Sequence, residues 1–454
     1  MNNLVENAIS KAMALADFDD RLMTPIATSS HIQSTILFIV LTAIWAAATR
    51  LCVEIARDGF HVLSHYIPRL SRHHNWHHRV FKRDMSKVSS ALYQRSQWHH
   101  DVPESVIMLM IAFSISISSF LISGWSSSSI GSFLCLLFTL HSLLMAILRG
   151  LGYKWAIEQD LNHKQTESVA HPGKWCVNWS YHQRHHFENP NAYFSGIFTL
   201  VDRLLGTALS LKRKTVVVTG ASGSLGKSLI ARLILEEAKV IALTSSHTNP
   251  IEVEVDGRLV QLKTVLWSVD NLDALDEVLK SADILVLNHG VNRRELTEAA
   301  VLDSIRVNAL SSYALLDRFT HTVKTAFDAA CKEVWVVTSE AEVASANSPV
   351  YELSKRLLGQ LVTFKRINSP CIIRKVVPGG FISKMSHDSR LSSDWVAQRI
   401  IEAVKKDGRN IVISPYRPWV YLYYPMHEWL VSAYAEQWSK SQISHDESTD
   451  GLDV

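Results

Sequence analysis

Long apolar runs dominate the first half of the chain. Between Glu104 and Arg149 there is no Asp, Glu, Lys or Arg, and the sequence GWSSSS in the middle of this run is typical of a turn. The run therefore predicts a helical hairpin whose arms can each cross a hydrocarbon core of roughly 30 Å. Together with a shorter run before it, this predicts membrane spans at about 34–51, 105–123 and 130–148. A buried helical hairpin in a soluble protein is the alternative.

From Lys214 onward the pattern changes to short β-rich runs that alternate with helical segments. The runs read KTVVVTG, KVIALT, TVLWSV, DILVLNHG, EVWVVTS, CIIRKVV and NIVIS. Such alternation predicts a Rossmann-like α/β fold, a doubly wound parallel sheet with helices on both faces. The expected organisation is a polar segment at 1–33, an all-α membrane domain at 34–210, the α/β domain at 214–415, and an aromatic amphipathic segment with an acidic tail at 416–454.

Composition and charge agree with two domains, one of them in a membrane. Charged residues make up 20% of the 454 residues, and the mean hydropathy of +0.06 is high for a purely soluble protein. The net charge of +3 is too small to indicate a nucleic-acid partner. Lys and Arg are frequent in 52–104 and after 149, so we expect these segments on the cytoplasmic side and the N-terminus opposite. Five scattered cysteines without a CxxC pair indicate neither a disulfide framework nor a thiolate zinc site.

The segment 415–438 is unusually rich in Trp and Tyr. These residues favour bilayer interfaces, so the segment is expected to dock on the membrane or against the first domain. Ordinary packing within the α/β domain explains the same composition, and the sequence does not decide between these interpretations.

Histidines gather in the two segments expected on the cytoplasmic side. The sequences HVLSH, HNWHH and HQRHH place His61 and His65, then His74, His77 and His78, then His182, His185 and His186, each set on one helix face. Imidazole suits iron, copper, nickel and zinc, and eight nitrogens are too many for a single ion. The spacing therefore indicates two metal ions close together. A basic membrane-facing surface is the alternative, although such surfaces favour Lys and Arg.

The order HxxxH, HxxHH, hydrophobic hairpin and second HxxHH resembles the fatty acid hydroxylase/sterol desaturase superfamily over residues 35–210. The sequences LNH at 161–163 and FTLVDRLLGT at 198–207 add to this resemblance. It implies a di-iron centre and O2-dependent hydroxylation or desaturation of a lipid. The sequence has no ferredoxin-type or cytochrome-binding motif, so we expect a separate electron-donor protein. The resemblance also implies the eight histidines as iron ligands, with His163 and His100 as further ones.

A glycine-rich turn, TGASGSLGKS, follows the first predicted strand of the α/β domain. Glycines there permit a tight turn and close approach of the backbone to a pyrophosphate at the helix N-terminus. The residues expected to contact the dinucleotide in this turn are Gly220, Ser222, Gly223, Ser224, Leu225 and Gly226. The second strand ends in Thr244 and Ser245 without a carboxylate, and Lys227 lies nearby, so NADP(H) is favoured over NAD(H).

The sequence YELSK places Tyr351 and Lys355 one helical turn apart. A nearby ammonium is expected to lower the pKa of the phenol and make it a general acid or base for an alcohol/carbonyl pair. Ser339 lies 12 residues upstream at a strand end, and Asn308 lies in a preceding helix. Because the Ser-to-Tyr spacing is one residue short of the common value, Thr338 is an alternative hydroxyl.

These residues resemble the short-chain dehydrogenase/reductase family over 214 to about 415. The resemblance implies that Tyr351 exchanges a proton with substrate, Lys355 binds the nicotinamide ribose, Ser339 orients the substrate oxygen, and Asn308 supports a water relay. The family's cofactor contacts match Asn288 and Gly290 in LNHG and Pro378, Gly379 and Ser383 in VPGGFIS. A degenerate nucleotide-binding module is the alternative.

The whole chain resembles bifunctional sterol desaturase/short-chain dehydrogenase fusions. This implies a bifunctional membrane lipid oxidoreductase that hydroxylates or desaturates a sterol, carotenoid or fatty acyl lipid and interconverts an alcohol and a carbonyl with NADP(H). One alternative is an enzyme that handles long-chain aldehydes, similar to plant wax-biosynthesis proteins. Another is a membrane-anchored short-chain reductase with an inactive metal domain.

Overall fold

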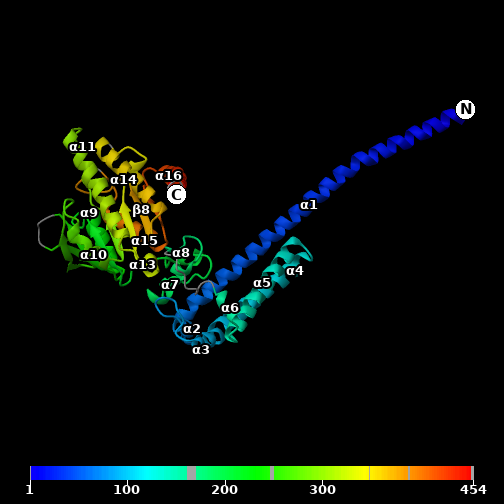
Figure 1. The fold of residues 1–454 in the computed structure, drawn as a ribbon, viewed down its shortest axis with the longest axis horizontal. Coiled ribbons are helices and arrows are strands. Elements are labelled where there is room, and N and C mark those ends of the chain that lie inside the picture. Colours follow the sequence, from blue (N-terminus) through cyan, green and yellow to red (C-terminus); the bar gives the residue numbers. More distant parts are fainter. Residues whose placement is uncertain (1, 161–169, 246–249, 347, 387–388, 451–454) are drawn as a thin grey trace. The chain divides into compact units, whose positions relative to one another are not determined.

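The computed structural model describes residues 2–160, 170–245, 250–346, 348–386 and 389–450 (Figure 1). Contacts divide the chain into a first unit of Met1–Val80 with Lys87–Gln159 and a second unit of Phe81–Ser86 with Asp160–Val454. This division differs from the predicted boundary at 210, because residues 170–210 pack into the second unit. The third histidine motif therefore belongs to the α/β unit.

The named elements of the first unit are all helices in the described residues, as predicted. Its elements are α1 (Asn2–Tyr66), α2 (Pro68–His78), α3 (Ser90–Ser96), the π-helix η1 (Gln97–Asp101), α4 (Val102–Ser123), α5 (Ser127–Gly150) and α6 (Lys154–Glu158). The predicted hairpin is formed by α4 and α5, which pack together, and α1 packs along α5. Gly124, with φ of +58°, ends α4, and a capping box at Ser126 starts α5, so the GWSSSS sequence forms the expected turn.

Small residues allow these helices to approach closely. A Cβ at Gly131 would lie 2.6 Å from the backbone oxygen of Thr42, so a larger residue would force α1 and α5 apart. The hydroxyls of Thr49 and Ser132 lie 3.2 Å apart across the same contact. Ser116 donates to the backbone oxygen of Ser132 at 2.9 Å between α4 and α5. Small and hydroxyl-bearing residues at helix contacts are typical of membrane bundles.

Three helical stretches are long and apolar enough to cross a membrane, namely Ile32–Tyr66, Ser90–Ser123 and Ser127–Gly150. Most of their apolar surface is exposed; Leu121 and Ile122, for example, are 77% and 86% exposed. A buried hairpin in a soluble protein would cover such side chains, so the unit is associated with a membrane. The helices extend beyond the predicted spans because α1 continues through the first histidine motif without a break.

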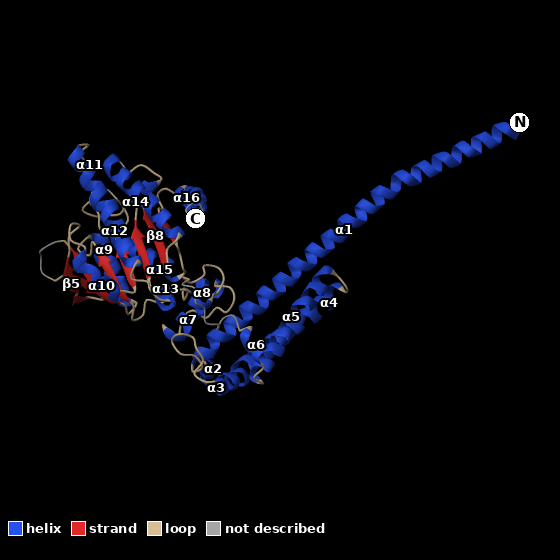
Figure 2. Cartoon of the chain, viewed as in Figure 1, coloured by secondary structure: helices blue, strands red, loops and turns tan. Residues whose placement is uncertain are grey.

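The second unit is built on a seven-stranded parallel sheet, which confirms the predicted fold (Figure 2). The strands are β1 (Thr215–Thr219), β2 (Lys239–Thr244), β5 (Lys263–Leu266), β6 (Ile284–Leu287), β7 (Glu333–Val337), β8 (Ile372–Pro378) and β9 (Asn410–Ile413). Their order is β5-β2-β1-β6-β7-β8-β9, so the winding direction reverses between β1 and β6. Ligands of such sheets bind beyond the carboxyl ends of the strands near this reversal.

Helices cover both faces of the sheet because successive strand residues point to opposite sides. On one face, α9 (Ser224–Leu235) and α15 (Ser393–Lys405) form a core with residues such as Val218 and Trp335. On the other face, α10 (Asp276–Ser281), α12 (Ser311–Thr320) and α14 (Pro349–Ile367) pack on residues such as Val217 and Val336. The strands are buried on both faces, which explains their continuous apolar runs.

A two-stranded antiparallel hairpin, β3 (Glu252–Val255) and β4 (Arg258–Gln261), was not predicted. Its turn is Asp256–Gly257, and both residues have positive φ, +48° and +75°. An Asp-Gly pair between alternating residues is a strong hairpin signal. The signal was present in the sequence.

Candidate functional site

A cavity of about 580 Å³ lies at the carboxyl ends of β6, β7 and β8. Three of the four predicted catalytic residues line it, namely Ser339, Tyr351 and Lys355. Ser339 directly follows β7 and caps the short helix η5 (Glu340–Glu342), where its hydroxyl accepts from the backbone N–H of Ala341 at 3.1 Å. Tyr351 and Lys355 lie in the first two turns of α14, which begins at Pro349. Helical spacing thus brings both side chains to one side of the cavity.

The structure distinguishes the two alternative hydroxyls. Thr338 donates to the backbone oxygen of Val376 at 3.2 Å, so its hydroxyl is engaged within the sheet. Burial raises the pKa of Tyr351, and a hydrogen bond with the Ser339 hydroxyl opposes this rise. Ser339 is therefore the hydroxyl beside the phenol. The expectation that the lysine lowers the pKa of Tyr351 was wrong, because burial dominates at the phenol.

Lys355 is buried beneath the cavity. Its Nζ donates to the backbone oxygen of Val337 at 3.1 Å and lies 5.8 Å from the ring centroid of Tyr351. Burial lowers the pKa of Lys355 to about 8, while the carboxylate of Glu342 acts in the opposite direction. The ammonium form therefore predominates near pH 7.

Asn308 lies in a π-helix, η4 (Arg306–Leu310), which joins α11 (Glu298–Ile305) to α12. Its side chain accepts from the backbone N–H of Val291 at 2.7 Å and donates to the backbone oxygen of Val291 at 2.8 Å and to the hydroxyl of Ser354 at 2.9 Å. These bonds fix the loop after β6 against α14. The side chain of Asn308 thus positions backbone, and its predicted part in a water relay stays a prediction.

The glycine turn has the form that a pyrophosphate site requires. Gly220 has φ of +63°, and a Cβ there would lie 2.9 Å from the backbone of His289. A Cβ at Gly226 would lie 2.2 Å from the backbone oxygen of Gly220, so only glycine lets the start of α9 pack so closely on the turn. Gly223 caps α9, Ser222 is exposed, and Ser224 and Leu225 form the first turn of that helix. The residues present therefore fit a dinucleotide phosphate at a helix N-terminus.

The other predicted cofactor residues occupy strand ends around the cavity. Thr244 is buried at the end of β2 and Ser245 is exposed beyond it. Asn288 donates through its backbone N–H to the hydroxyl of Thr219 at 2.9 Å. The remaining predicted cofactor residues also line the cavity: Gly290 after β6, Pro378 and Gly379 at the end of β8, and Ser383 beyond it.

The cavity also has polar residues that were not predicted, among them His289, Glu340 and Arg417. His289 lies between the hydroxyls of Thr219 and Ser311, at 2.8 and 2.9 Å, and burial, followed by the charge of Lys355, lowers its pKa to about 3. Arg417 pairs with Glu340 at 3.2 Å, and both line the cavity. The Glu340–Arg417 pair joins residues far apart in the sequence and had no local signal.

Six of the predicted metal ligands meet in the first unit. They are His61, His65, His74, His77, His78 and His100. Nε2 of His74 lies 3.2 Å from Nε2 of His61 and 2.8 Å from Nε2 of His78, and its Nδ1 lies 2.5 Å from Nε2 of His100. A neutral imidazole has one N–H, so this crowding of ring nitrogens is typical of side chains arranged around metal ions.

The surroundings of His74 keep its ring neutral. Burial, and then the neighbouring imidazole of His61, lower the pKa of His74. Donor atoms of His77, His100 and Asp101 lie within 4.8 Å of one another. The carboxylate of Asp101, which was not predicted, is therefore a further candidate metal ligand. His100 and Asp101 belong to the π-helix η1, a form often found at functional sites. This donor set fits a transition metal such as iron.

The third histidine motif lies on α7 (Trp179–Phe187) in the second unit. Nε2 atoms of His182 and His186 lie 3.0 Å apart. Nδ1 of His185 lies 2.8 Å from the backbone oxygen of Ala192, which can only accept, so Nδ1 carries the proton. Nε2 of His185 is then the nitrogen with a lone pair, as a metal ligand requires. His163 lies outside the described residues.

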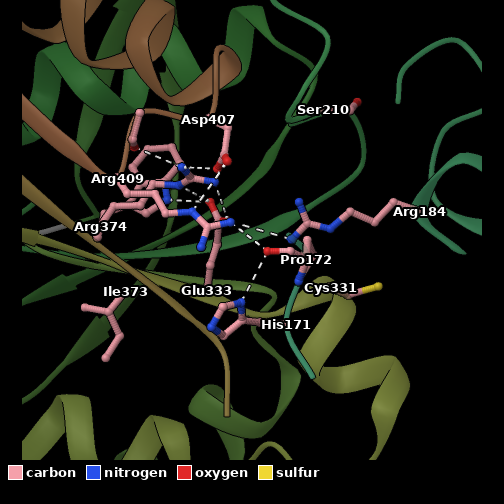
Figure 3. Close-up of polar contacts among 12 residues, drawn as sticks. His171, Pro172, Arg184, Ser210, Cys331, Glu333, Ile373, Arg374, Asp407 and Arg409 are labelled. Atoms are coloured by element: carbon pink, nitrogen blue, oxygen red, sulfur yellow. Dashed lines mark hydrogen bonds and ion pairs between the residues drawn. The ribbon is translucent and has the colours of Figure 1, made fainter. Parts of the chain in front are cut away.

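A buried ion-pair network holds α7 to the amino ends of β7 and β8 (Figure 3). Arg184, 1% exposed, lies 3.8 Å from Glu333. Arg374 donates to both carboxylate oxygens of Glu333, at 3.1 and 2.9 Å, and to Asp407 at 2.7 Å. Burial raises the pKa of Glu333, but the charge and hydrogen bonds of Arg374 outweigh burial and bring it to about 2. Arg409 donates to the backbone oxygen of Pro172 at 2.6 Å and ties in the chain before α7.

Several known proteins are similar to parts of this chain. The short chain dehydrogenase family model matches residues 214–390. Solved structures that are similar include a short chain dehydrogenase from Burkholderia cenocepacia in complex with NADP (16% identity, 47% of this chain and 93% of that chain, TM-score 0.40). Another is a short chain dehydrogenase from Leptospira borgpetersenii with bound NAD+ (20% identity, 44% of this chain and 91% of that chain, TM-score 0.37).

A relative of similar length covers both units. The monoglucosyldiacylglycerol epimerase of Synechocystis sp. is 43% identical over 405 residues, which are 87% of this chain and 97% of that protein. The chain therefore belongs to the same family as this epimerase, and its second unit is a short-chain dehydrogenase/reductase domain.

Proposed function

We propose that the protein is a membrane-bound epimerase that inverts one secondary alcohol carbon in the sugar headgroup of a glycosyl diacylglycerol. The observation that carries the proposal is the cavity that brings Ser339, Tyr351 and Lys355 together in a chain 43% identical to a monoglucosyldiacylglycerol epimerase. Oxidation of an alcohol to a ketone, followed by reduction from the other face, inverts the carbon without net redox change. A glycolipid therefore replaces the sterol, carotenoid or fatty acyl substrate expected for the dehydrogenase site.

The proton is handled by Tyr351. When the alcohol carbon loses its hydride, the phenolate oxygen takes the hydroxyl proton, and it returns this proton to the carbonyl oxygen when hydride is added back. Ser339, beside the phenol, orients the sugar oxygen during both steps. The hydrogen bond of the Ser339 hydroxyl favours the phenolate against the effect of burial, and the ammonium of Lys355 would bind the nicotinamide ribose.

A bound nicotinamide dinucleotide supplies the hydride acceptor in the first half of the reaction and the hydride donor in the second. Gly220, Gly223 and Gly226 would hold its pyrophosphate, and Asn288 and Gly290 the nicotinamide end. We propose NADP(H), because β2 ends in Thr244 and Ser245, whose hydroxyls do not repel a 2′-phosphate.

Inversion requires the ketone to present its opposite face to a fixed hydride donor. The cavity of about 580 Å³ lies within the range of roughly 300–1,000 Å³ common for ligand sites, which leaves room for a sugar ring to turn. Its polar lining includes Asn292, Arg294, Glu340, Ser348 and Arg417, which offer hydrogen-bond partners for the hydroxyls of a hexose. A lipid tail that stays outside acts as a flexible tether during this turn.

The experiment is to incubate the purified chain, in lipid nanodiscs, with monoglucosyldiacylglycerol and NADP+. The expected product is a glycolipid whose hydrolysed sugar is an epimer of glucose, formed with no net gain of NADPH and at the same rate without O2. Accumulation of a keto sugar with matching NADPH would instead indicate a simple dehydrogenase. An unchanged sugar would contradict the proposal.

We also propose that the imidazoles of the first unit hold iron, on the cytoplasmic side of the membrane. The crowding of ring nitrogens around His74, together with the resemblance of the histidine motifs, favours this second function. Bound iron would supply O2-dependent hydroxylation or desaturation of a lipid, with electrons from a separate donor protein. The ligands within the unit would be His61, His65, His74, His77, His78 and His100, while His163, His182, His185 and His186 stay predictions from the resemblance.

Metal content per chain tests this second proposal. Elemental analysis of the detergent-purified protein is expected to find about two irons per chain, because eight imidazole nitrogens are too many for a single ion. His77→Ala should lower this content, whereas His141→Ala, an exposed histidine within α5, should not. Zinc alone, or iron that is equally retained in both variants, would contradict an iron site at these histidines.

A further inference from the structure

The C-terminal helix α16 (Val420–Asp450) has an apolar outer face. Val420, Tyr424, Glu428 and Ala435 are buried, and the helix packs on α14. The other sides of the helix form what we call the α16 aromatic surface: Tyr421, Leu422, Tyr423, Met426, Trp429, Leu430, Tyr434 and Trp438, all exposed. Leu422 is 81% and Trp429 67% exposed. An apolar surface of this size marks an interaction site.

On a soluble protein a surface helix turns its charged residues outward, whereas α16 turns its charged residue inward and its apolar residues outward. The buried face carries the charge: Glu428 accepts from Arg366 at 2.9 Å, from Lys375 at 2.8 Å and from Thr363 at 3.0 Å. Between Trp419 and Trp438, Glu436 is the one charged residue besides Glu428. The buried ion pairs therefore fix the rotation of the helix with its apolar face outward.

The α16 aromatic surface begins beside the catalytic cavity. Arg417 lines the cavity, pairs with Glu340 and donates to the backbone oxygen of Ser345 at 2.6 Å. The hydroxyl of Tyr421 accepts from the backbone N–H of Ser414 at 3.2 Å, which secures the first turn of the helix to the end of β9. The surface and the site are thus rigidly linked within one unit.

We propose that the α16 aromatic surface docks the dehydrogenase unit on the bilayer interface, so that a lipid headgroup reaches the cavity directly from the membrane. At roughly 100° per residue, the residues from Trp429 through Leu422 to Tyr434 cover an arc of roughly 140°, a convex surface that can sink into an interface. Trp and Tyr favour bilayer interfaces, and the helices of the first unit already associate the chain with a membrane.

Docking itself rests on α16, and only the delivery of a sugar headgroup rests on the proposed function. Lipid contact is measured on the full chain in phosphatidylcholine nanodiscs, with the exposed Cys52 and Cys176 replaced by alanine. A polarity-sensitive fluorophore is placed at Met426→Cys or Leu430→Cys, and spin-labelled phosphatidylcholine is the quencher. The matched control is Leu259→Cys, an exposed leucine on β4, 73% accessible.

Quenching is expected to be about threefold stronger at the α16 positions than at Leu259, because only the former enter the interface. Equal, weak quenching at all positions would overturn the proposal. An apolar fluorophore environment without lipid quenching, in nanodiscs that hold two chains, would also overturn it, since a second copy would then cover the surface.

Activity forms the second readout. In the double variant Met426→Glu/Leu430→Glu, KM for the bilayer glycolipid is expected to rise about tenfold, while kcat/KM for a water-soluble short-chain glucoside stays within about twofold. Equal losses on both substrates would overturn a docking role. If neither substrate reacts even with the unaltered chain, the proposed function fails, and strong quenching at α16 still supports docking.

Discussion

Tyr351→Phe is expected to lower kcat for epimerisation by about 10²–10⁴-fold, because the variant loses the proton acceptor and donor of both half-reactions. The ring fills the same space beside Ser339, so NADP(H) affinity should change by no more than about twofold. Steady-state rates on glycolipid nanodiscs and fluorescence titration of NADPH measure the two quantities.

A second tyrosine of the same unit serves as the matched control. Tyr313 lies on α12, packed against the core and outside the residues that line the cavity, so Tyr313→Phe should retain activity. Comparable losses in both variants would show that the first acts through packing. A Tyr351→Phe enzyme with full activity would remove the phenol from the mechanism.

Glu333→Ala is expected to lower the free energy of unfolding by about 3–5 kcal/mol, the usual cost of breaking a buried ion pair. The variant leaves the fully buried guanidinium of Arg374 without its bidentate partner, and Arg184 without its nearest strand carboxylate. Urea unfolding of the detergent-solubilised chain, followed by circular dichroism, measures the loss. Asp394→Ala, which breaks the exposed pair with Arg232, should cost less than about 1 kcal/mol.

The same pair has a defined pH dependence. The pKa of Glu333 lies near 2 in the folded chain against an ordinary 4.5, so its contribution is complete above pH 4.5 and is lost as pH falls toward 2. The stability difference between the unaltered chain and Glu333→Ala should therefore shrink over this window. A constant difference down to pH 2 would show that Glu333 contributes by packing alone.

The parallel sheet was predictable because its strands are buried on both faces. Runs such as VVVT after Lys214 and VWVV after Glu333 leave a local signature, and each became a strand. The Tyr351–Lys355 pair was equally local, since one helical turn separates the two residues. The β3–β4 hairpin also had a local signal, in Asp256–Gly257.

The boundary between the units depended on contacts that no local pattern reveals. Arg184 reads as one more cation in a basic histidine motif, and Glu333 as an ordinary residue before a strand. Only the fold brings Arg184 and Glu333 together, with Arg374 on β8 pairing with Glu333 on the neighbouring strand β7. The same contacts make the third histidine motif part of the α/β unit. A charge buried in an ion pair has the same sequence signature as a solvated one.

The sequence by itself determined the apolar helices, the parallel sheet and the pairing of Tyr351 with Lys355, because these follow from periodicity and short spacings. The tertiary structure alone decided that Ser339 and not Thr338 faces Tyr351, and that burial sets the pKa of that phenol. It also decided that α16 turns Glu428 inward and its aromatic residues outward. Each of these outcomes depends on the direction of a side chain and on its distant partners, which only the folded chain fixes.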